Sequence, residues 1–533
     1  MNFFDLNKKQ VCIFLFAFFS FFLFGSSKVP VLDRDEARFA SASKDMIYND
    51  EYIDITIGDE KRYKKPIGIY WAQILSNKLF GHEPYTEIFF YRLPSALGIG
   101  LSLFLIFSFF SPIFGREAAF LSIFFLTFSL ITMSEINQAK TDGLLFLFIT
   151  ICNIILFKSL RGKLNLLLLS SFWLSLALGV LTKGPIILIF VFLPLPVLCI
   201  LQKKNYFKNV FSLAGLSIFL VAVLPWFILI TIKSDGMFWS ESVGHDLLKK
   251  IGTSQESHGF FPGYYSFLIF VFFWPAAAFV PALLSNIRFK WKKIISNDEQ
   301  VFLILWFLVP FLFYEIIFTK LPHYVFPTYP FLSLLVSNFL VTKRFKDLEY
   351  ISLPLLFFPV LFSFIFIYAI NEYSSLDTIS IMIFCICVGL IITLNILKRS
   401  KKVKQMILFT GAFQCFLYFV VTGHMVNKLD KFWISQKINS IIEEKKGKFD
   451  KIYHYGFNEP SLFFLTSQNA HMLSPSELKL QELQNEKIIF FLTGEYSNLL
   501  NIEKFNKFKL TNSFKGFNYT RGKSVDINIF ENQ

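Results

Sequence analysis

The sequence predicts an α-helical protein that crosses a membrane many times. Of its 533 residues, 54% are hydrophobic and only 17% are charged, and the mean hydropathy is +0.52. This composition excludes an ordinary soluble globular protein. Apolar runs close to the ~20 residues that cross ~30 Å of hydrocarbon recur along the chain. We expect about thirteen spans, at residues 11–27, 87–110, 116–133, 141–157, 164–181, 185–201, 209–232, 263–284, 300–318, 324–341, 350–370, 376–397 and 405–425.

The distribution of basic residues predicts how these spans are oriented. If Lys8 and Lys9 lie in the cytoplasm and the spans alternate, each later cytoplasmic loop carries Lys or Arg, whereas the external connection Asn371–Asp377 carries neither. Such loops collect positive charge. The net charge of +14 therefore indicates contact with lipid headgroups rather than with nucleic acid. We interpret the first apolar run as an uncleaved span; a signal peptide ending near Gly25 is the alternative.

The same orientation divides the chain into two domains. We expect a transmembrane domain at 1–426, with a first external loop at 28–86 and a second at 233–262. Residues 427–533 are more polar and predict a small soluble α/β domain outside the cytoplasm. Their helix-like and strand-like patterns lie at 438–446, 451–455, 488–492 and 524–530. The six cysteines all lie in apolar runs and indicate no disulfide or metal site.

An acidic pair, Asp35 and Glu36, opens the polar part of the first external loop and is followed by Arg38. One carboxylate beside an incoming hydroxyl can act as a general base. Two adjacent carboxylates can instead share a divalent cation with phosphate oxygens. A third interpretation is structural, because acidic residues also cap the N-terminus of a helix.

Basic and aromatic residues recur in the same external connections. Lys65 precedes Pro66, which suits the first turn of a helix, and a Lys there can meet a phosphate. Asp142 opens a span and needs a partner, for which Lys140 or Arg38 are candidates. Further donors, each of which also fits a snorkelling or solvated residue, are Lys183, His245, Lys249, Lys250, His258, Lys320, His323 and Tyr324.

These weak signals share one predicted face of the membrane. An acidic pair surrounded by Lys, His and Tyr suits a reaction on a phosphate-bearing lipid, because basic groups stabilise the leaving phosphate while a carboxylate activates an acceptor. The chain has neither a GxGxxG nor a Walker A motif. We therefore expect no nucleotide at the active site.

Six motifs, in their order and spacing, resemble the ArnT-like integral-membrane glycosyltransferases, which are related to the protein O-mannosyltransferases and share the GT-C fold. The resemblance covers about residues 28–335. It is carried by LDRDEARFA, YKKPIGIYWAQ, AKTDGLLF, LGVLTKGP, the GHD…SHGFFPGYY loop and TKLPHYVFPTYP.

The resemblance implies transfer of a sugar from a polyprenyl-phosphate donor to a lipid A-type or other envelope acceptor. It also implies a bacterial inner membrane, a cytoplasmic N-terminus and a periplasmic C-terminal domain. The catalytic candidates are then Asp35, Glu36 and Asp142. The candidates for the donor phosphate are Arg38, Lys65, Lys183, His245, Lys249, Lys250, Lys320 and Tyr324, and those for a divalent metal are Glu36 and His258.

Two departures bear on the metal and on the sugar. The position before Lys65, acidic and metal-linked in the arabinose enzymes, is Lys64, and the Arg-rich loop motif of those enzymes is replaced by residues 245–250. A protein O-mannosyltransferase-like enzyme is one alternative. A non-enzymatic polyprenyl-lipid flippase is another, although no repeated halves support it.

Overall fold

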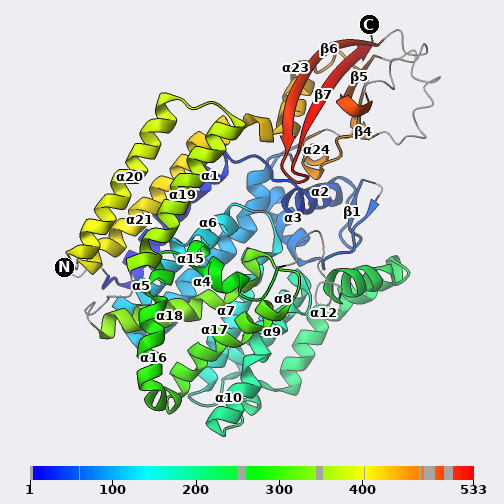
Figure 1. Cartoon of the computed structure of the whole chain (residues 1–533). Helices are drawn as coiled ribbons and strands as arrows, with labels where there is room; N and C mark the ends of the chain where they lie inside the picture. The colour runs from blue at the N-terminus through cyan, green and yellow to red at the C-terminus, as the bar shows by residue number, and fades with distance from the viewer. Residues whose placement is uncertain are drawn as a thin grey trace.

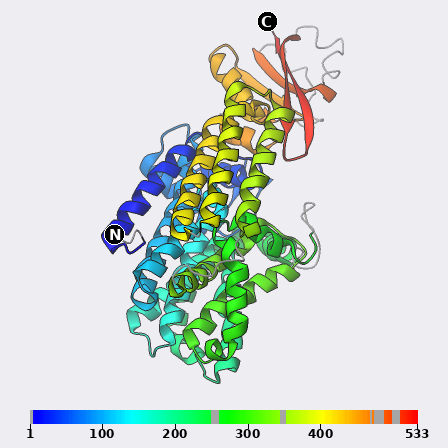
Figure 2. The same ribbon diagram turned by 60° about the vertical axis from the view of Figure 1, so that its left-hand side comes forward.

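A computed structural model describes residues 4–58, 60–248, 260–343, 352–400, 402–466, 470–472, 487–496 and 508–532. A long helical bundle carries a small sheet domain at one end, as Figures 1 and 2 both show. The bundle core is one large cluster of buried apolar side chains, many of them Phe. The predicted architecture, a polytopic helical protein with a small α/β domain, is confirmed.

Ten apolar helices of the described chain are long enough to cross a membrane. Two further pairs are bent, α5 (Arg116–Thr127) with α6 (Leu130–Ile136) by 62°, and α15 (Tyr264–Phe272) with residues 276–288 by 116°. The ten helices are α1 (Lys8–Ser26), α4 (Ile88–Phe114), α7 (Thr141–Ser159), α8 (Leu166–Lys183), α12 (Leu213–Lys233), α17 (Asp298–Ile316), η3 with α18 (Pro322–Thr328 and Tyr329–Thr342), α19 (Ser352–Tyr373), α20 (Thr378–Arg399) and α21 with η5 and α22 (Val403–Val420, Val421–Met425 and Val426–Lys428).

The expected count of thirteen spans differs from the structure at residues 185–201. This apolar run folds as two short helices, α9 (Ile186–Phe192) and α10 (Pro194–Gln202). Pro194 explains the division, since proline has no N–H for the preceding helical turn. The remaining short bundle helices are α11 (Phe207–Val210), α13 (Met237–Trp239), η1 (Ser240–Leu248), η2 (Ala276–Phe279) and α16 (Val280–Ile295).

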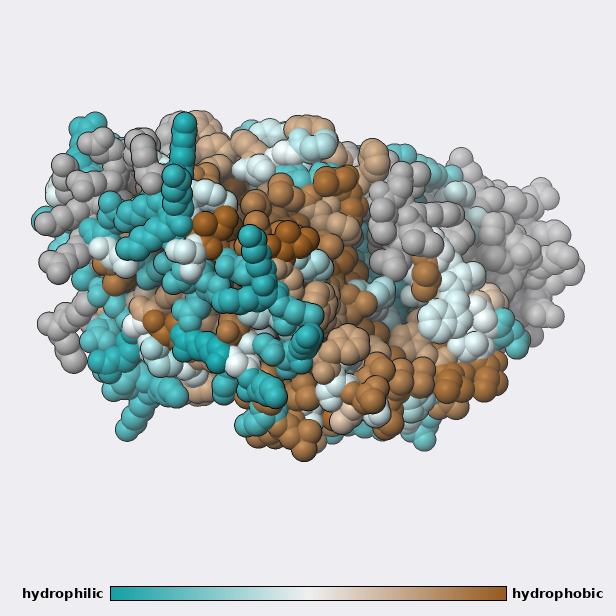
Figure 3. Space-filling view, turned by 90° about the horizontal axis from the view of Figure 1, so that it is seen from below, coloured by the Kyte–Doolittle hydropathy of each residue, from teal (hydrophilic) through white to brown (hydrophobic). Residues whose placement is uncertain are grey.

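Loops that were predicted to share a membrane face do meet. At the end of the bundle away from the sheet domain, the loops are joined by ion pairs, including Arg161 with Glu299 (2.5 Å) and Lys204 with Asp298 (2.7 Å). Figure 3 views this end, where hydrophilic side chains gather beside hydrophobic ones. At the opposite end the first external loop folds as α2 (Asp35–Tyr48), α3 (Gly68–Phe80) and the strand pair β1 (Thr56–Ile57) and β2 (Glu60–Lys61).

The C-terminal domain is a five-stranded mixed sheet in the order β4-β3-β5-β7-β6. β3 pairs in parallel with β4 and β5, whereas β7 pairs antiparallel with β5 and β6. The predicted helix and three predicted strands are present. The elements are η6 (Asp430–Phe432), α23 (Ile434–Glu444), β3 (Lys451–Tyr455), α24 (Pro460–Leu465), β4 (Ala470–Met472), β5 (Ile488–Thr493), β6 (Phe508–Asn518) and β7 (Lys523–Asn532).

Candidate active site

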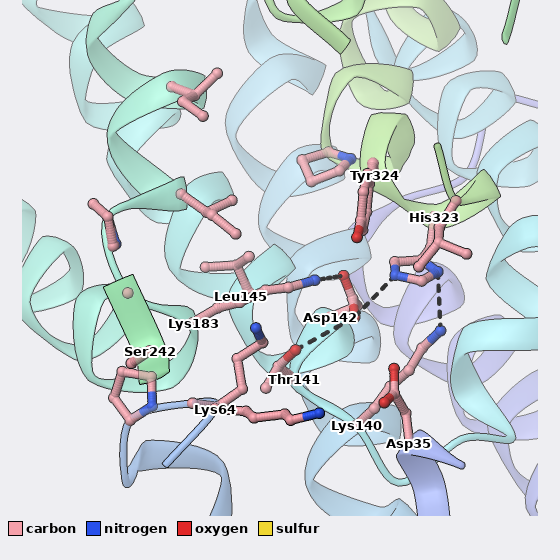
Figure 4. A pocket seen from close by; sticks show the side chains of 18 of the residues that line it. Asp35, Lys64, Lys140, Thr141, Asp142, Leu145, Lys183, Ser242, His323 and Tyr324 are labelled. Atoms are coloured by element: carbon pink, nitrogen blue, oxygen red, sulfur yellow. Dashed lines mark hydrogen bonds and ion pairs between the residues drawn. The ribbon is translucent and has the colours of Figure 1, made fainter. Parts of the chain in front are cut away.

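A cavity opens at the end of the bundle that carries α2 and the C-terminal domain (Figure 4). Five separate segments supply the ionisable and phenolic residues of its wall: the first external loop, the start of α7, the end of α8, α17 and η3. Their ionisable or phenolic lining residues are Asp35, Arg62, Lys64, Lys65, Lys140, Asp142, Lys183, His323, Tyr314 and Tyr324. An apolar wall of Ile186, Ile189, Phe190 and Phe313 adjoins them, so the cavity can hold a molecule with a charged head and a hydrocarbon chain.

Asp35 is the first residue of α2 and its side chain is exposed to the cavity. Burial by the surrounding protein raises the pKa of this carboxyl, but the positive charges of Arg62, Lys140 and Lys65 outweigh burial and hold the pKa below its ordinary value. The N-terminus of α2 favours the same charged form. Asp35 is therefore a carboxylate that can accept a proton from a molecule in the cavity.

Asp142 and Lys183 form a buried ion pair in the wall of the cavity. Lys183 Nζ lies 2.6 Å from Asp142 Oδ1, and the His323 ring lies 3.8 Å from Oδ2. The hypothesis that Asp142 pairs with Lys140 or Arg38 is wrong. The partner of Asp142 could not be predicted from neighbouring residues, because Lys183 is distant in the sequence and reaches Asp142 from the end of a neighbouring helix.

Close helix packing fixes the depth of Asp142. A Cβ built on Gly143 would lie 2.5 Å from the carbonyl oxygen of Ser95, and a Cβ on Gly98 would lie 2.5 Å from that of Gly143. Only glycine permits α4 and α7 to approach this closely. The Ser95 hydroxyl also donates to the carbonyl of Lys140 (2.8 Å), which fixes the turn that precedes α7.

Lys140 lies between the cavity and a buried carboxylate. Its Nζ is 2.9 Å from Glu135 Oε1 and 3.2 Å from His323 Nδ1. Burial lowers the pKa of Lys140, but Glu135 and Asp142 outweigh this effect and raise it. Lys140 therefore stays protonated and adds positive charge beside Asp35, as Figure 4 shows.

The structure gives Glu36 a structural role in place of the predicted catalytic or metal-binding one. Its carboxylate accepts two hydrogen bonds from Arg92, with Nε–Oε1 at 2.9 Å and Nη2–Oε2 at 2.8 Å, and both side chains are almost fully buried (2% and 0% exposed). The backbone N–H groups of Leu32 and Ala139 donate to the same two oxygens. Glu36 does not line the cavity and has no oxygen left to bind a metal.

Two other expected phosphate ligands also lie away from the cavity wall. Lys320 is buried and its Nζ donates to the carbonyl of Ile317. Arg38 is half-buried on α2 but is not among the residues that line the cavity. Lys65, Lys183 and Tyr324 do line it, and the Lys183 ammonium lies 5.5 Å from the centre of the Tyr324 ring.

The second external loop is described only in part. Ser242 and Val243 of η1 line the cavity, and His245 belongs to the same helix. Lys249, Lys250 and His258 lie outside the described residues. Among the residues that are described, no three His, Cys, Asp or Glu side chains form a group that could hold a metal ion.

The sequence analysis did not select Arg62, Lys64 or Glu135, and it named Lys140 only as a partner for Asp142 and His323 only as one of several donors. All five lie within seven positions of a predicted site residue, so nearness in the external loops was the available signal. Arg62 is the most informative omission. Its guanidinium is buried 5.4 Å from the Phe39 ring, and its Nε has no hydrogen-bond partner within the described structure.

This fold and this cavity define an integral-membrane protein of the GT-C type. The family model for dolichyl-phosphate-mannose-protein mannosyltransferases matches residues 64–229. The crystal structure of ArnT from Cupriavidus metallidurans bound to undecaprenyl phosphate has the same fold, with a TM-score of 0.75 over 98% of both chains at 15% identity. Its apo form superposes with a TM-score of 0.74.

The chain is also similar in sequence to curated arabinosyl transferases. It is 28% identical over 324 residues to undecaprenyl phosphate-alpha-4-amino-4-deoxy-L-arabinose arabinosyl transferase 2 of Proteus mirabilis, which covers 58% of this chain and 56% of the relative. The corresponding transferase of Photorhabdus laumondii is 26% identical over 57% of this chain and 54% of its own length. The matches span about half the length of these curated relatives. The predicted resemblance to the ArnT-like family is confirmed.

Proposed function

We propose that the protein is a glycosyltransferase that moves a sugar from a polyprenyl-phosphate donor to an acceptor at the membrane face where the cavity opens. The observation that carries the proposal is the Asp35 carboxylate, kept ionised by Arg62, Lys140 and Lys65 at the mouth of a cavity with an apolar wall. A lipid chain fits the apolar wall and a phosphate fits the cations. The similarity to undecaprenyl-phosphate-dependent arabinosyl transferases supports the same assignment.

The reaction follows from this arrangement. The acceptor hydroxyl transfers its proton to Asp35 while its oxygen attacks the anomeric carbon of the sugar. The bond between the anomeric carbon and the phosphate oxygen breaks, and its electron pair stays on the phosphate. The polyprenyl phosphate therefore leaves with one more negative charge, which Arg62, Lys64 and Lys65 stabilise. Attack opposite to the leaving group inverts the anomeric centre, and no nucleotide takes part.

The proposal extends to the location and to the substrates. The cavity faces the periplasm in a bacterial inner membrane, and the N-terminus lies in the cytoplasm. 4-Amino-4-deoxy-arabinose is the first donor sugar to test, and a lipid A-type glycolipid is the first acceptor, in view of the names of the relatives. Mannose and a protein acceptor are the second combination, in view of the family model.

Transfer by the purified protein in lipid nanodiscs tests the proposal. Undecaprenyl-phosphate carrying each radiolabelled sugar is offered together with lipid A or an envelope extract. Asp35→Asn is expected to lower the rate by about 10²- to 10⁴-fold, which is the typical contribution of a general base. The matched control is Asp50→Asn, an exposed position of the same loop with φ of 51°, a conformation that Asn tolerates.

Two results would contradict the proposal. A wild-type protein that binds the carrier but never cleaves it with any acceptor indicates a flippase. An Asp35→Asn variant that transfers at the wild-type rate removes the proposed base. The role of a divalent cation is tested by chelation. Because Glu36 does not fit a metal, we expect activity to persist in EDTA, and recovery of lost activity on adding Zn²⁺ or Mg²⁺ would overturn this expectation.

A further inference from the structure

The residue before Asp35 holds a backbone conformation that its own chemistry disfavours. Arg34 is the N-cap of α2 and has φ of 68° and ψ of −115°. A positive φ places the Cβ of an L-residue against its own backbone and is disfavoured for residues other than glycine. The Arg34 side chain does not cap the N-terminus of α2. The Leu32 N–H donates to the Glu36 carboxylate (2.8 Å) and supports this turn locally, and further interactions reach the turn from elsewhere in the protein.

Those interactions come from the C-terminal domain, nearly five hundred residues along the chain. The Arg34 Nη2 donates to the carbonyl of Thr520 (2.5 Å). The backbone N–H of Asp33 donates to the hydroxyl of Tyr519 (2.7 Å). The carboxylate of Asp33 in turn accepts a hydrogen bond from the N–H of Ser461 (2.9 Å), in the first turn of α24. Both residues before Asp35 are thus bound to the sheet domain.

The turn that holds Arg34 is itself well ordered. Residues 519–522 connect β6 to β7, and the Asn518 side chain accepts hydrogen bonds from the N–H and the hydroxyl of Thr520 at 3.1 and 2.8 Å. Asn518 also donates to Glu459 (2.8 Å), just before α24. The two C-terminal elements that contact the segment 33–34 are therefore linked to one another.

The body of α2 is fixed to the same domain. Lys44 Nζ donates to the carbonyl oxygens of Phe464 (2.8 Å) and Thr466 (3.3 Å), at the end of α24. The Phe464 ring packs in a small buried cluster with Ala37, Ala40 and Ala139, next to Lys140 in the cavity wall. Figure 1 shows α24 lying against α2 at this end of the bundle. Asp35 therefore stands at the end of a helix that the C-terminal domain holds along its length.

We propose that the C-terminal domain positions the base of the transfer reaction, with Tyr519 and Arg34 as positioning residues that set the direction of the Asp35 carboxylate. The inference rests on the proposed function, because it assigns a role to the neighbours of the proposed base. It makes the sheet domain part of the catalytic architecture rather than an accessory. Neither residue touches the cavity, so both act through Asp35.

Two variants test the positioning role without removing a charged group from the cavity. Tyr519→Phe deletes the hydroxyl that accepts from the Asp33 N–H. Arg34→Gly deletes the guanidinium but tolerates the positive φ. Each is expected to lower kcat about 5- to 50-fold, with KM for the undecaprenyl-phosphate sugar unchanged and a decrease in the thermal midpoint Tm too small to account for the loss of kcat. Tyr496→Phe, the same chemical change at an exposed tyrosine of the same domain, is expected to retain wild-type kcat.

The pH profile of kcat separates the two roles, because a residue that only stabilises the fold does not shift it. If Asp35 turns away from Arg62 and Lys140, its pKa rises, and the acid limb of kcat shifts toward neutral pH in both variants. Wild-type kcat and pH profile in Tyr519→Phe and Arg34→Gly, together with an inactive Asp35→Asn, would overturn the inference and leave the proposed function intact. A decrease in kcat that only parallels a decrease in Tm would also overturn it. An inactive wild type would refute the proposed function and the inference with it.

Discussion

Lys183, the last residue of α8, contacts Asp142, in the first turn of α7, with 2.6 Å between Nζ and Oδ1. The pair is buried, and η3 covers it with His323 and Tyr324. The pair and the two η3 side chains thereby join three segments of the cavity wall. The energetic value of the ion pair depends on both charges remaining together.

The first prediction concerns this pair. Asp142→Asn alone leaves the Lys183 ammonium buried without its counter-charge, and Lys183→Met alone takes the directly bonded ammonium from the Asp142 carboxylate and leaves the more distant His323 ring (3.8 Å). Each is expected to destabilise the protein by about 3–5 kcal/mol. The double variant removes both charges and is expected to recover part of the lost stability. Thermal unfolding in detergent of the four proteins measures the coupling. Additive decreases in Tm would show that the two residues do not depend on each other.

The second prediction separates the two adjacent carboxylates of α2. Glu36→Gln breaks the buried pair with Arg92 and is expected to destabilise the protein by about 3–5 kcal/mol. The turnover of the folded fraction should stay within about tenfold of wild type, because Glu36 does not face the cavity. Asp35→Asn is expected to do the reverse, with little change in Tm and a large loss of turnover. The experiment compares Tm and kcat of both variants. A Glu36→Gln variant that is stable but inactive would show that Glu36 takes part in catalysis.

This contrast shows what the sequence could and could not determine. Adjacent residues of a helix point about 100° apart. The sequence Asp35-Glu36 therefore indicates that one of the two carboxylates can face the cavity, but it does not indicate which one. The choice depends on Arg92, which binds Glu36 from 56 positions away and simultaneously satisfies the carbonyls of Ser26, Val29 and Pro30. No local pattern contains that information.

The prediction of a shared face succeeded for a general reason. Alternating apolar spans and basic cytoplasmic loops determine which connections lie together, even when their distances are unknown. Lys65, Asp142, Lys183 and Tyr324 were all assigned to one face, and all line one cavity. Arg34 illustrates the opposite limit. Its positive φ accompanies a contact with the distant Thr520, and no glycine or asparagine indicates it in the sequence.

The third prediction concerns the pH dependence of transfer. Arg62 is the strongest of the positive neighbours that lower the pKa of Asp35. Arg62→Gln removes that charge, so the pKa of Asp35 rises and the carboxylate is protonated at higher pH. Because the base must be ionised, the acid limb of kcat should shift toward neutral pH. The plateau should also fall by about 10- to 100-fold through loss of a phosphate contact.

The control for this measurement is Lys61→Gln, in which the lost charge is an exposed one paired with Asp54 outside the cavity. Its acid limb is expected to coincide with that of the wild type. An acid limb that stays in place in Arg62→Gln would mean that Asp35 does not control the reaction at low pH.

The last prediction concerns Asp33, at the contact between the two domains. Burial, together with nearby Glu459, raises the pKa of this carboxyl to about 6, although hydrogen bonds from Ser461 and Tyr519 favour the charged form. The folded protein therefore binds a proton between pH 6 and about 4 that the unfolded chain releases. Stability should rise as the pH falls through 6, and this contribution is absent above it.

Asp33→Asn keeps an oxygen for the Ser461 N–H but cannot titrate. Its Tm is expected to exceed that of the wild type at pH 7.5, and the difference should shrink as the pH falls through 6 and vanish only below about pH 4, where the unfolded carboxyl is protonated as well. Lys44, whose pKa burial lowers to about 8, titrates above this window and does not contribute to it. A Tm difference that stays constant from pH 5 to 7.5 would show that Asp33 is ionised throughout, and the contact between the domains would then be insensitive to pH.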